Sequence, residues 1–415
     1  MIQWAVGICI STALFYGANM KKAWYMSIFL VLMGLGLVAA SLNESLPLNY
    51  WDKPQATGGI HDGLENNMRP EACAQCHQEQ FNAWRDSKHA HAYSPGLVGQ
   101  FSNMGHGAGN DCLVCHAPLA EQLYRDAGDM KATLSTLLEN PEGFSRDADL
   151  DAKQAKLPLR HAGVTCAVCH VRQGKRFGPR RRGSDLVGPL DGAAHGGFIA
   201  TKDFEKSQLC ASCHQFPQSY AINGKPLENT VFEWQQSRFS REGVQCQTCH
   251  MPDRKHEFKG IHDINMVRSG LKFDMKKQGK LATLTMTSVN IGHAFPTYVT
   301  PKVLVKAESL DAQGRVLQDW QWVIIREVGY DNGWKEKQDT RLMPGESRVF
   351  VANDLNKNTA SVRFYVDVVP DAFYKGVYQN LLSSDLQPKS RALIAKALSD
   401  ADKNDYRLYE NELKL

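Results

Sequence analysis

The sequence predicts an α + β chain of several domains: a mainly α-helical, loop-rich region, then a small antiparallel β-sandwich, then a helical tail. Three observations support this fold class. Ten of the eleven cysteines form five close pairs between residues 73 and 250. Runs typical of β-strands begin after about residue 271, and apolar and charged residues recur at helical spacing after residue 371. The composition, 43% apolar and 22% charged over 415 residues, excludes a disordered chain, collagen and a multi-pass membrane protein.

Residues 1–42 are predicted to be a signal peptide or a membrane anchor. Two lysines precede an apolar run from Ala23 to Ala40, which ends in the small residues of a cleavage site. Eighteen apolar residues fit either a cleaved or a retained segment. The apolar stretch before Met20 fits a start site placed too early, which we favour, or the first span of a helical hairpin. Residues 43–60, with prolines, glycines and little periodicity, are predicted to be a linker.

Each of the five cysteine pairs is spaced C-x-x-C and is followed at once by histidine. The motifs are Cys73/Cys76/His77, Cys112/Cys115/His116, Cys166/Cys169/His170, Cys210/Cys213/His214 and Cys246/Cys249/His250. Zinc sites, disulfides and thioredoxin-like dithiols also use paired cysteines, but none requires the following histidine. With 14 histidines in the chain, five such positions by chance have odds on the order of 10⁻⁸. Five covalent c-type haems are therefore predicted, each attached through two thiols, with the motif histidine as an axial iron ligand.

Residues 61–270 are predicted to form one pentahaem domain, in which short helices carry the five motifs and long loops join them. The motifs leave about 36 residues for each haem, too few for a separate apolar core around each porphyrin, so the haems must supply the core. Haem irons and propionates also change the formal net charge of +4 to about −1. The charge is therefore no argument for nucleic-acid binding, and none is predicted.

Residues 271–370 are predicted to be the β-sandwich, and residues 371–415 the helical tail. Five runs have strand character, and turn signals such as Asn332-Gly333 and Pro344-Gly345 separate them. The runs are Leu281–Val289, Val303–Leu310, Trp320–Glu327, Arg348–Ala352 and Ala360–Val369. In the tail, the apolar spacing predicts two or three helices.

Nine histidines lie outside the motifs, enough to give every iron a second axial histidine. We predict His89, His161, His195, His262 and His293 as these ligands. His89 lies one short helix after a motif, and His161 lies just before one. His195 lies in a glycine-rich loop, and His262 lies beside an aspartate. His293 lies in the β-domain and is expected to reach back to a haem, joining the domains. His61 and His256 are reserves, His91 and His106 are expected at the surface, and methionine is the alternative ligand for any one iron.

The motif regions resemble the cytochrome c554-like superfamily of multihaem cytochromes, also called cytochrome c-552/4 domain proteins. The matching stretches are Cys73–His77 with Trp84-x-x-Ser87-x-His89, Cys112–Leu119, Gly163–His170, Cys210–Phe216, Cys246–Pro252 and Gly292–Thr297. The resemblance covers roughly residues 60 to 300. It implies closely stacked, mostly bis-histidine haems that conduct electrons, and it supports the five ligands predicted above. The C-x-x-C-Lys motif of the related nitrite reductases is absent from this sequence.

These observations predict a periplasmic pentahaem cytochrome that carries single electrons between redox partner proteins of the periplasm or membrane, with an N-terminal tether to the inner membrane as an option. The alternative is an oxidoreductase acting on hydroxylamine, nitrite or a similar small compound at one five-coordinate haem. The sequence favours electron transfer over catalysis, and we predict no catalytic residue and no small-molecule substrate. A basic cluster of Lys175, Arg176 and Arg180 to Arg182 is interpreted as a solvated or propionate-paired loop, with docking of an acidic partner as the alternative.

Overall fold

The computed structural model describes residues 57–58, 67–101, 104–141, 157–192 and 195–415. The chain divides into two compact units, Met1–Leu46 and Pro47–Leu415, and every described residue belongs to the second. The predicted export segment and most of the predicted linker thus lie outside the described residues. Within the described ranges, no helix is both long and apolar enough to cross a membrane.

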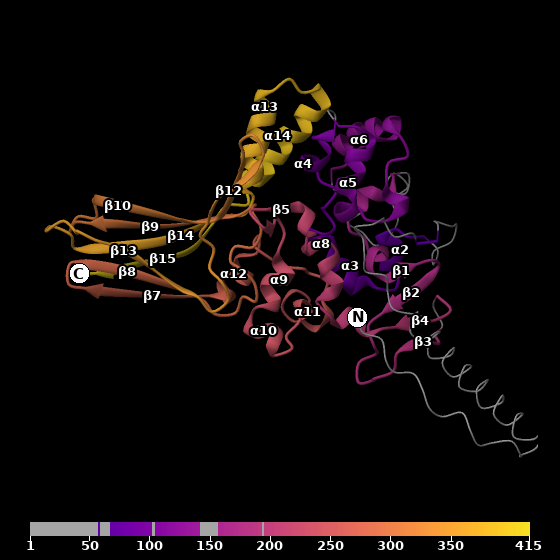
Figure 1. Cartoon of the computed structure of the whole chain (residues 1–415), viewed down its shortest axis with the longest axis horizontal. Coiled ribbons are helices and arrows are strands. Elements are labelled where there is room, and N and C mark those ends of the chain that lie inside the picture. Colours follow the sequence, from indigo (N-terminus) through magenta and orange to yellow (C-terminus); the bar gives the residue numbers. More distant parts are fainter. Residues whose placement is uncertain (1–56, 59–66, 102–103, 142–156, 193–194) are drawn as a thin grey trace, which may run out of the picture. The chain divides into compact units, whose positions relative to one another are not determined.

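Up to Gly270, the described chain consists of short helices and loops (Figure 1). The α-helices are α2 (Pro70–Ala74), α3 (Gln78–Arg85), α4 (Pro95–Val98), α5 (His106–His116), α6 (Ala127–Glu139), α7 (Cys166–His170), α8 (Gln208–His214), α9 (Thr230–Gln235), α10 (Arg238–Arg241), α11 (Cys246–His250) and α12 (Ile264–Gly270). Local sequence sets their ends. Ser94 caps α4 by accepting from the N–H of Leu97, and Asp126 caps α6 in the same way.

Small strand groups are inserted between these helices. Strands β1 (Val171–Arg172), β2 (Lys175–Gly178), β3 (Gly188–Leu190) and β4 (Phe198–Ala200) form a sheet of order β1-β2-β4-β3, and β5 (Ala221–Ile222) pairs with β6 (Lys225–Pro226). The apolar side chains of the helical region pack in separate small clusters around Leu113, Val168 and Phe81 rather than in one core. The motif helix α11 buries none of its residues. Protein side chains alone therefore give this region little continuous packing.

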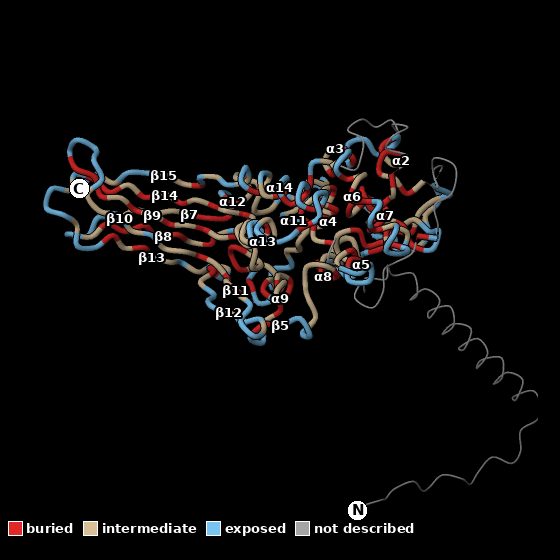
Figure 2. The backbone as a smooth tube through the Cα atoms, turned by 90° about the horizontal axis from the view of Figure 1, so that it is seen from above, coloured by how far each residue is buried: buried red, intermediate tan, exposed pale blue. Residues whose placement is uncertain are grey.

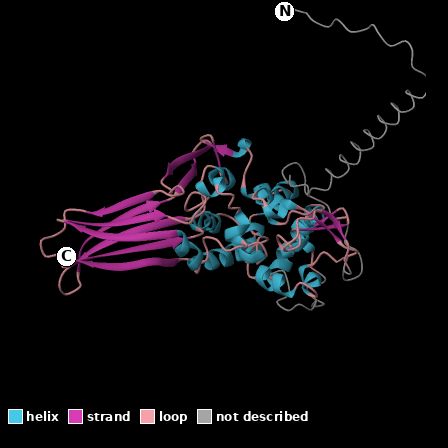
Figure 3. Ribbon diagram, turned by 90° about the horizontal axis from the view of Figure 1, so that it is seen from below, coloured by secondary structure: helices cyan, strands magenta, loops and turns pink. Residues whose placement is uncertain are grey.

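After Gly270 the chain forms antiparallel strands, shown together in Figure 3. They are β7 (Leu271–Gln278), β8 (Leu281–Ser288), β9 (Lys302–Leu310), β10 (Val316–Ile324), β11 (Arg326–Tyr330), β12 (Trp334–Asp339), β13 (Ser347–Ala352) and β14 (Ser361–Val369). Strands β13-β8-β7 form one sheet, and β11 pairs with β12. The other large sheet has the order β10-β9-β14-β15, where β15 is the C-terminal strand Tyr406–Lys414. Alternate residues of β9 and β14 are buried, as Figure 2 shows in red, and both larger sheets contribute to one apolar core.

The C-terminal tail is only partly helical. Helices α13 (Ala372–Ser383) and α14 (Pro388–Asp402) agree with the prediction, but residues 406–414 form strand β15 (Tyr406–Lys414), so the prediction of helix there is wrong. Strand β15 pairs antiparallel with β14 and buries Leu408 against the β core. An unpaired β14 edge offers backbone hydrogen bonds that outweigh the weak helical spacing of this segment. The prediction of an α + β multidomain chain is confirmed.

Candidate haem centres

Four of the five C-x-x-C-H motifs share one local structure. Both cysteines lie in a helix, and the histidine is its last residue: His116 in α5, His170 in α7, His214 in α8 and His250 in α11. A helical turn places residues three apart on one face, so the two thiols of each of these motifs point to the same side. None of the ten motif cysteines forms a disulfide bond.

The first motif differs, because Cys76 does not lie in a helix. Helix α2 contains Cys73 but ends at Ala74, Cys76 lies in the turn that follows, and His77 is the N-cap of α3. The prediction that a helix carries the whole motif is therefore wrong at Cys76. The backbone N–H groups of Cys76 and His77 still donate to the carbonyl of Cys73, at 3.2 and 2.9 Å, so a tight turn keeps the three residues together.

Cys76 also differs from most motif cysteines in its exposure. Cys76 and Cys249 are exposed, whereas the other eight are half-buried. The neighbouring protein chain therefore encloses these two thiols least. The attachment of haems at Cys76 and at the other nine motif cysteines stays a prediction from the motifs.

Thiols of different motifs also lie close together. Hydrogen bonds link Cys73 to Cys166, Cys115 to Cys213 and Cys210 to Cys246. The bond from Cys210 is the largest influence on the thiol of Cys246 and lowers its pKa to about 7. Burial raises the pKa of Cys169 to about 11, and this thiol also interacts electrostatically with Cys210 and Cys213. The fourth motif is therefore hydrogen-bonded to the second and the fifth, and its thiols are near enough to the third for an electrostatic interaction.

Four motif histidines each face a histidine from outside the motifs. The ring centroids are 6.5 Å apart for His77 and His195, 6.2 Å for His214 and His89, 6.2 Å for His170 and His256, and 6.3 Å for His250 and His293. The rings of the first and last pairs are nearly parallel, at 14° and 15°. A metal–imidazole bond is about 2 Å long and each ring nitrogen lies about 1 Å from its centroid, so two rings on opposite sides of one iron have centroids about 6 Å apart. The spacing of all four pairs fits an iron between the rings.

The protonation of these rings also suits metal binding. Burial lowers the pKa of His89 to about 3, assisted by His214 and His250, and burial lowers the pKa values of His170, His214 and His293 to about 4. At neutral pH these imidazoles are uncharged. A neutral imidazole keeps a nitrogen lone pair for a metal.

Hydrogen bonds at Nδ1 leave Nε2 as the ligating atom. The Nδ1–H groups of His116, His170 and His250 donate to the carbonyls of Ala92 (2.8 Å), Phe177 (2.8 Å) and Lys259 (2.6 Å). Among the partner histidines, His256 donates to Arg254 and His293 to Ala294, both at 3.0 Å. Such acceptors fix the tautomer and the orientation of a metal-binding ring.

Two of the five predicted distal ligands, His262 and His161, are not paired with a motif histidine in the described part of the chain. Nε2 of His262 is 3.0 Å from Oδ1 of Asp371, so an ion-pair partner from the tail occupies the atom expected to bind iron. Instead the reserve residue His256 faces His170. His256 and His262 both follow the last motif closely. The sequence favoured His262 because Asp263 is beside it, but the side chain of Asp263 caps α12. No local sequence signal separates the two candidates, because Asp371 is 109 residues from His262.

His161 is buried but is not paired with a motif histidine in the described part of the chain. Its ring packs on Tyr93 at 5.2 Å, and its Nε2 is 3.3 Å from Oγ1 of Thr136. Its Nδ1 is buried without a hydrogen-bond partner among the described residues. The reserve His61 lies outside those residues. His161 therefore stays a sequence prediction.

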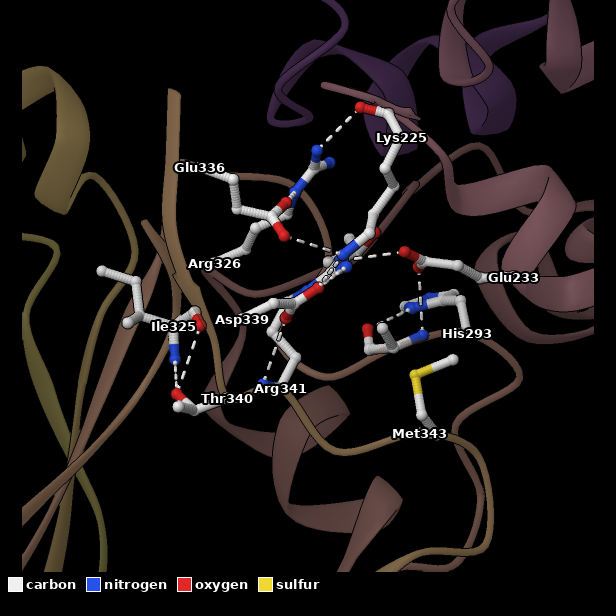
Figure 4. A network of polar contacts seen from close by, with 12 residues as sticks. Lys225, Glu233, His293, Ile325, Arg326, Glu336, Asp339, Thr340, Arg341 and Met343 are labelled. Atoms are coloured by element: carbon white, nitrogen blue, oxygen red, sulfur yellow. Dashed lines mark hydrogen bonds and ion pairs between the residues drawn. The ribbon is translucent and has the colours of Figure 1, made fainter. Parts of the chain in front are cut away.

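A buried polar network supports the loop that carries His293 (Figure 4). Glu233 of α9 accepts from the backbone N–H of Ala294 at 3.1 Å and from Arg341 at 2.9 Å. Arg341 also binds both carboxylate oxygens of Asp339, which in turn contacts Lys225. Arg326, fully buried, donates to Glu336 and to the carbonyl of Lys225. These contacts join α9 and the β5–β6 hairpin to strands β11 and β12 beside His293.

The basic cluster is extensively paired. Arg180 forms ion pairs with Glu205 and Asp185, and Arg182 pairs with Asp253 at 2.6 Å. Arg181 donates to the carbonyl of Asp191 at 2.9 Å. These acceptors reduce the positive field that the cluster would otherwise present to an acidic partner.

Comparison with known proteins finds similarity to multihaem cytochromes. The model of a family described as outer membrane cytochrome MtrC/MtrF-like, domains II/IV, matches residues 100–263, which include the second to fifth motifs. The chain is a multihaem c-type cytochrome. This prediction is confirmed. The match to this family supports covalently bound haems and a role in electron transfer.

A solved structure has a similar fold. It is a penta-haem cytochrome c552 from Thermochromatium tepidum, which matches this cytochrome with a TM-score of 0.53 and 18% identity over 84% of this chain and 98% of the other. At this identity the likeness concerns the fold. The count of five haems rests on the five motifs and on the description of this neighbour. A search of curated proteins finds no match.

Proposed function

We propose that this protein is an exported pentahaem cytochrome that carries single electrons along its covalent haems between redox partner proteins. The observation that carries the proposal is the set of four histidine pairs with centroids 6.2–6.5 Å apart. Two imidazoles on one iron keep it low-spin and leave no open position for a substrate. Such an iron exchanges electrons without binding a small molecule.

The proposed ligand set follows from these pairs. The ten motif cysteines, the exposed Cys76 and Cys249 included, attach the porphyrins, and the proximal ligands are His77, His116, His170, His214 and His250. His195, His256, His89 and His293 are the proposed distal ligands of the first, third, fourth and fifth haems. For the iron of His116, the sequence prediction of His161 is the candidate to test. His262 is left out of the set because Asp371 holds its Nε2.

The thiol contacts suggest an order for the haems. Each thiol becomes a thioether at a porphyrin edge, so thiols that touch bring two porphyrin edges close together. Thiol hydrogen bonds link motif one to three, motif four to five and motif two to four. The electrostatic interaction of Cys169 with Cys213 indicates that motif three lies near motif four. We infer a line from haem one through three and four to five, with haem two joined at haem four.

The partners and the compartment are also part of the proposal. Covalent attachment of haem takes place outside the bacterial cytoplasm, and the predicted leader would export the chain. We propose partners among periplasmic or membrane redox proteins. Fractionation of cells that produce the full chain checks this location, and recovery of the haem-loaded protein in the cytoplasm would contradict it.

Spectroscopy of single variants tests the function. Replacement of His256 by Ala should convert one low-spin haem to high-spin in the EPR spectrum and allow that ferrous haem to bind CO. The matched control is His106→Ala, because His106 is exposed at the start of α5 and should leave the spectrum unchanged.

Spectra and activity of the unmodified protein distinguish an electron-transfer protein from an enzyme. We expect five haems per chain and at least four low-spin signals. A high-spin haem in the unmodified protein that turns over nitrite or hydroxylamine would contradict the electron-transfer proposal and support the oxidoreductase alternative.

A further inference from the structure

Among the motif histidines, His214 has a distinctive hydrogen-bond partner. The Nδ1 atoms of His116, His170 and His250 lie 2.6–2.8 Å from backbone carbonyls. The Nδ1 of His214 instead contacts the hydroxyl of Tyr298, and Oε2 of Glu228 lies 3.8 Å away. Tyr298 comes from the loop between β8 and β9, the same loop that carries His293. One loop of the β-domain thus reaches the ligands of two neighbouring haems.

The structure holds Tyr298 in place for this contact. Its ring lies 6.0 Å from that of His214, with 14° between the planes. Its hydroxyl bonds to Thr230, whose Oγ1 is 2.6 Å from Oγ1 of Thr297. The backbone of Tyr298 has a φ of 67°, a strained value for a bulky residue. Strain of this kind persists only where surrounding contacts enforce it, and it is commonly found at functional sites.

We propose that Tyr298 sets the reduction potential of the haem attached at Cys210 and Cys213, the junction of the haem order proposed above. By accepting the Nδ1–H of His214, the phenol oxygen makes the imidazole a stronger electron donor, which stabilises the ferric iron. One electron converts this ferric iron to ferrous iron. The Nδ1 proton stays in place, and no other bond forms or breaks. The inference rests on the proposed function, and Tyr298 acts as a positioning residue through His214.

The test is a spectroelectrochemical titration of the haem-loaded full chain with Tyr298→Phe. Loss of the acceptor should raise one of the five midpoint potentials, increasing its ratio of ferrous to ferric haem about tenfold at a given applied potential, which is about 59 mV for a one-electron couple. The EPR signal of the same haem should shift while staying low-spin. The matched control is Tyr330→Phe, because Tyr330 is 73% exposed on β11 and should change neither readout.

Two further variants separate the ways in which the inference can fail. If Tyr298→Phe does not fold, Thr230→Val keeps the phenol and removes its hydrogen-bond partner, and a smaller rise in the same potential is expected. Unchanged potentials in whichever variant folds would overturn the role of Tyr298. His89→Ala tests the proposed function at the same iron. If it produces a high-spin haem while Tyr298→Phe has no effect, the ligand set stands and only this inference fails.

Discussion

The helical region before Gly270 and the β region after it are stabilised differently. In the β region, side chains such as Leu284, Val305 and Phe364 are fully buried in one continuous core formed by both larger sheets. In the helical region, the apolar side chains form separate clusters, and the same region carries the ten motif thiols and three of the four histidine pairs. The fourth pair joins His250 to His293 of the β region. Alternating apolar residues suffice to hold a sheet together, whereas we expect the helical region to depend on haems bound at its motifs.

The largest expected effect is loss of the helical fold when the haems cannot attach. With all ten motif cysteines replaced by serine, we expect the region up to Gly270 to lose protection from hydrogen exchange, while strands β8, β9 and β14 keep theirs. Cys9→Ser is the control, because this residue lies outside the motifs. Equal protection of both regions in the haem-free chain would contradict the difference described here.

The next effect concerns the contact between the regions. Arg341→Ala leaves the buried carboxylate of Glu233 without its guanidinium, and the side chain of Glu233 is only 4% exposed. Breaking a buried ion pair in this way costs about 3–5 kcal/mol. Denaturant unfolding followed by circular dichroism measures this loss.

The control for Arg341→Ala is Arg363→Ala on β14. The side chain of Arg363 is 37% exposed, and its ion pairs lie at 3.4–4.0 Å. This change should cost less than about 1 kcal/mol. Equal losses for the two variants would show that the network behind His293 does not stabilise the contact between the regions.

A cavity in the β core should affect stability without reaching the haems. Leu284→Ala removes a fully buried side chain and should lower the free energy of unfolding by about 3 kcal/mol. The optical and EPR spectra of the folded protein should stay unchanged. Val349→Ala, at a 54% exposed position of β13, is the matched control. Altered haem spectra in Leu284→Ala would mean that the two regions are not packed independently.

The sequence predicts those features that depend on neighbouring residues. The C-x-x-C-H spacing is a local property of one helical turn, and four motifs do end helices. Strands β8, β9 and β14 follow from the alternation of apolar and polar residues. The partners of the motif histidines were partly predictable: His89, His195 and His293 face motif rings.

Features that depend on contacts between distant residues could not be predicted from the spacing of neighbouring residues. Strand β15 forms because the edge of β14 is available, although the spacing of residues 406–414 suggested a helix. The preference for His256 over His262 depends on Asp371, and the partner of His214 comes from a loop 84 residues away. Each outcome depends on a contact between elements, which spacing along the chain does not encode.

The smallest expected effect separates a structural histidine from an iron ligand. His262→Ala removes the ion pair with Asp371, whose carboxylate also accepts from Asn404 at 2.6 Å. Both partners of the ion pair are partly exposed, so the loss should be about 1 kcal/mol or less. Thermal unfolding measures this cost, and the EPR spectrum should retain every low-spin signal of the unmodified protein. The comparison with His256→Ala is direct, because the two histidines are six positions apart and only one faces a motif ring. A new high-spin signal in His262→Ala would return His262 to the set of iron ligands and would mean that the bond to Asp371 gives way when the haem binds.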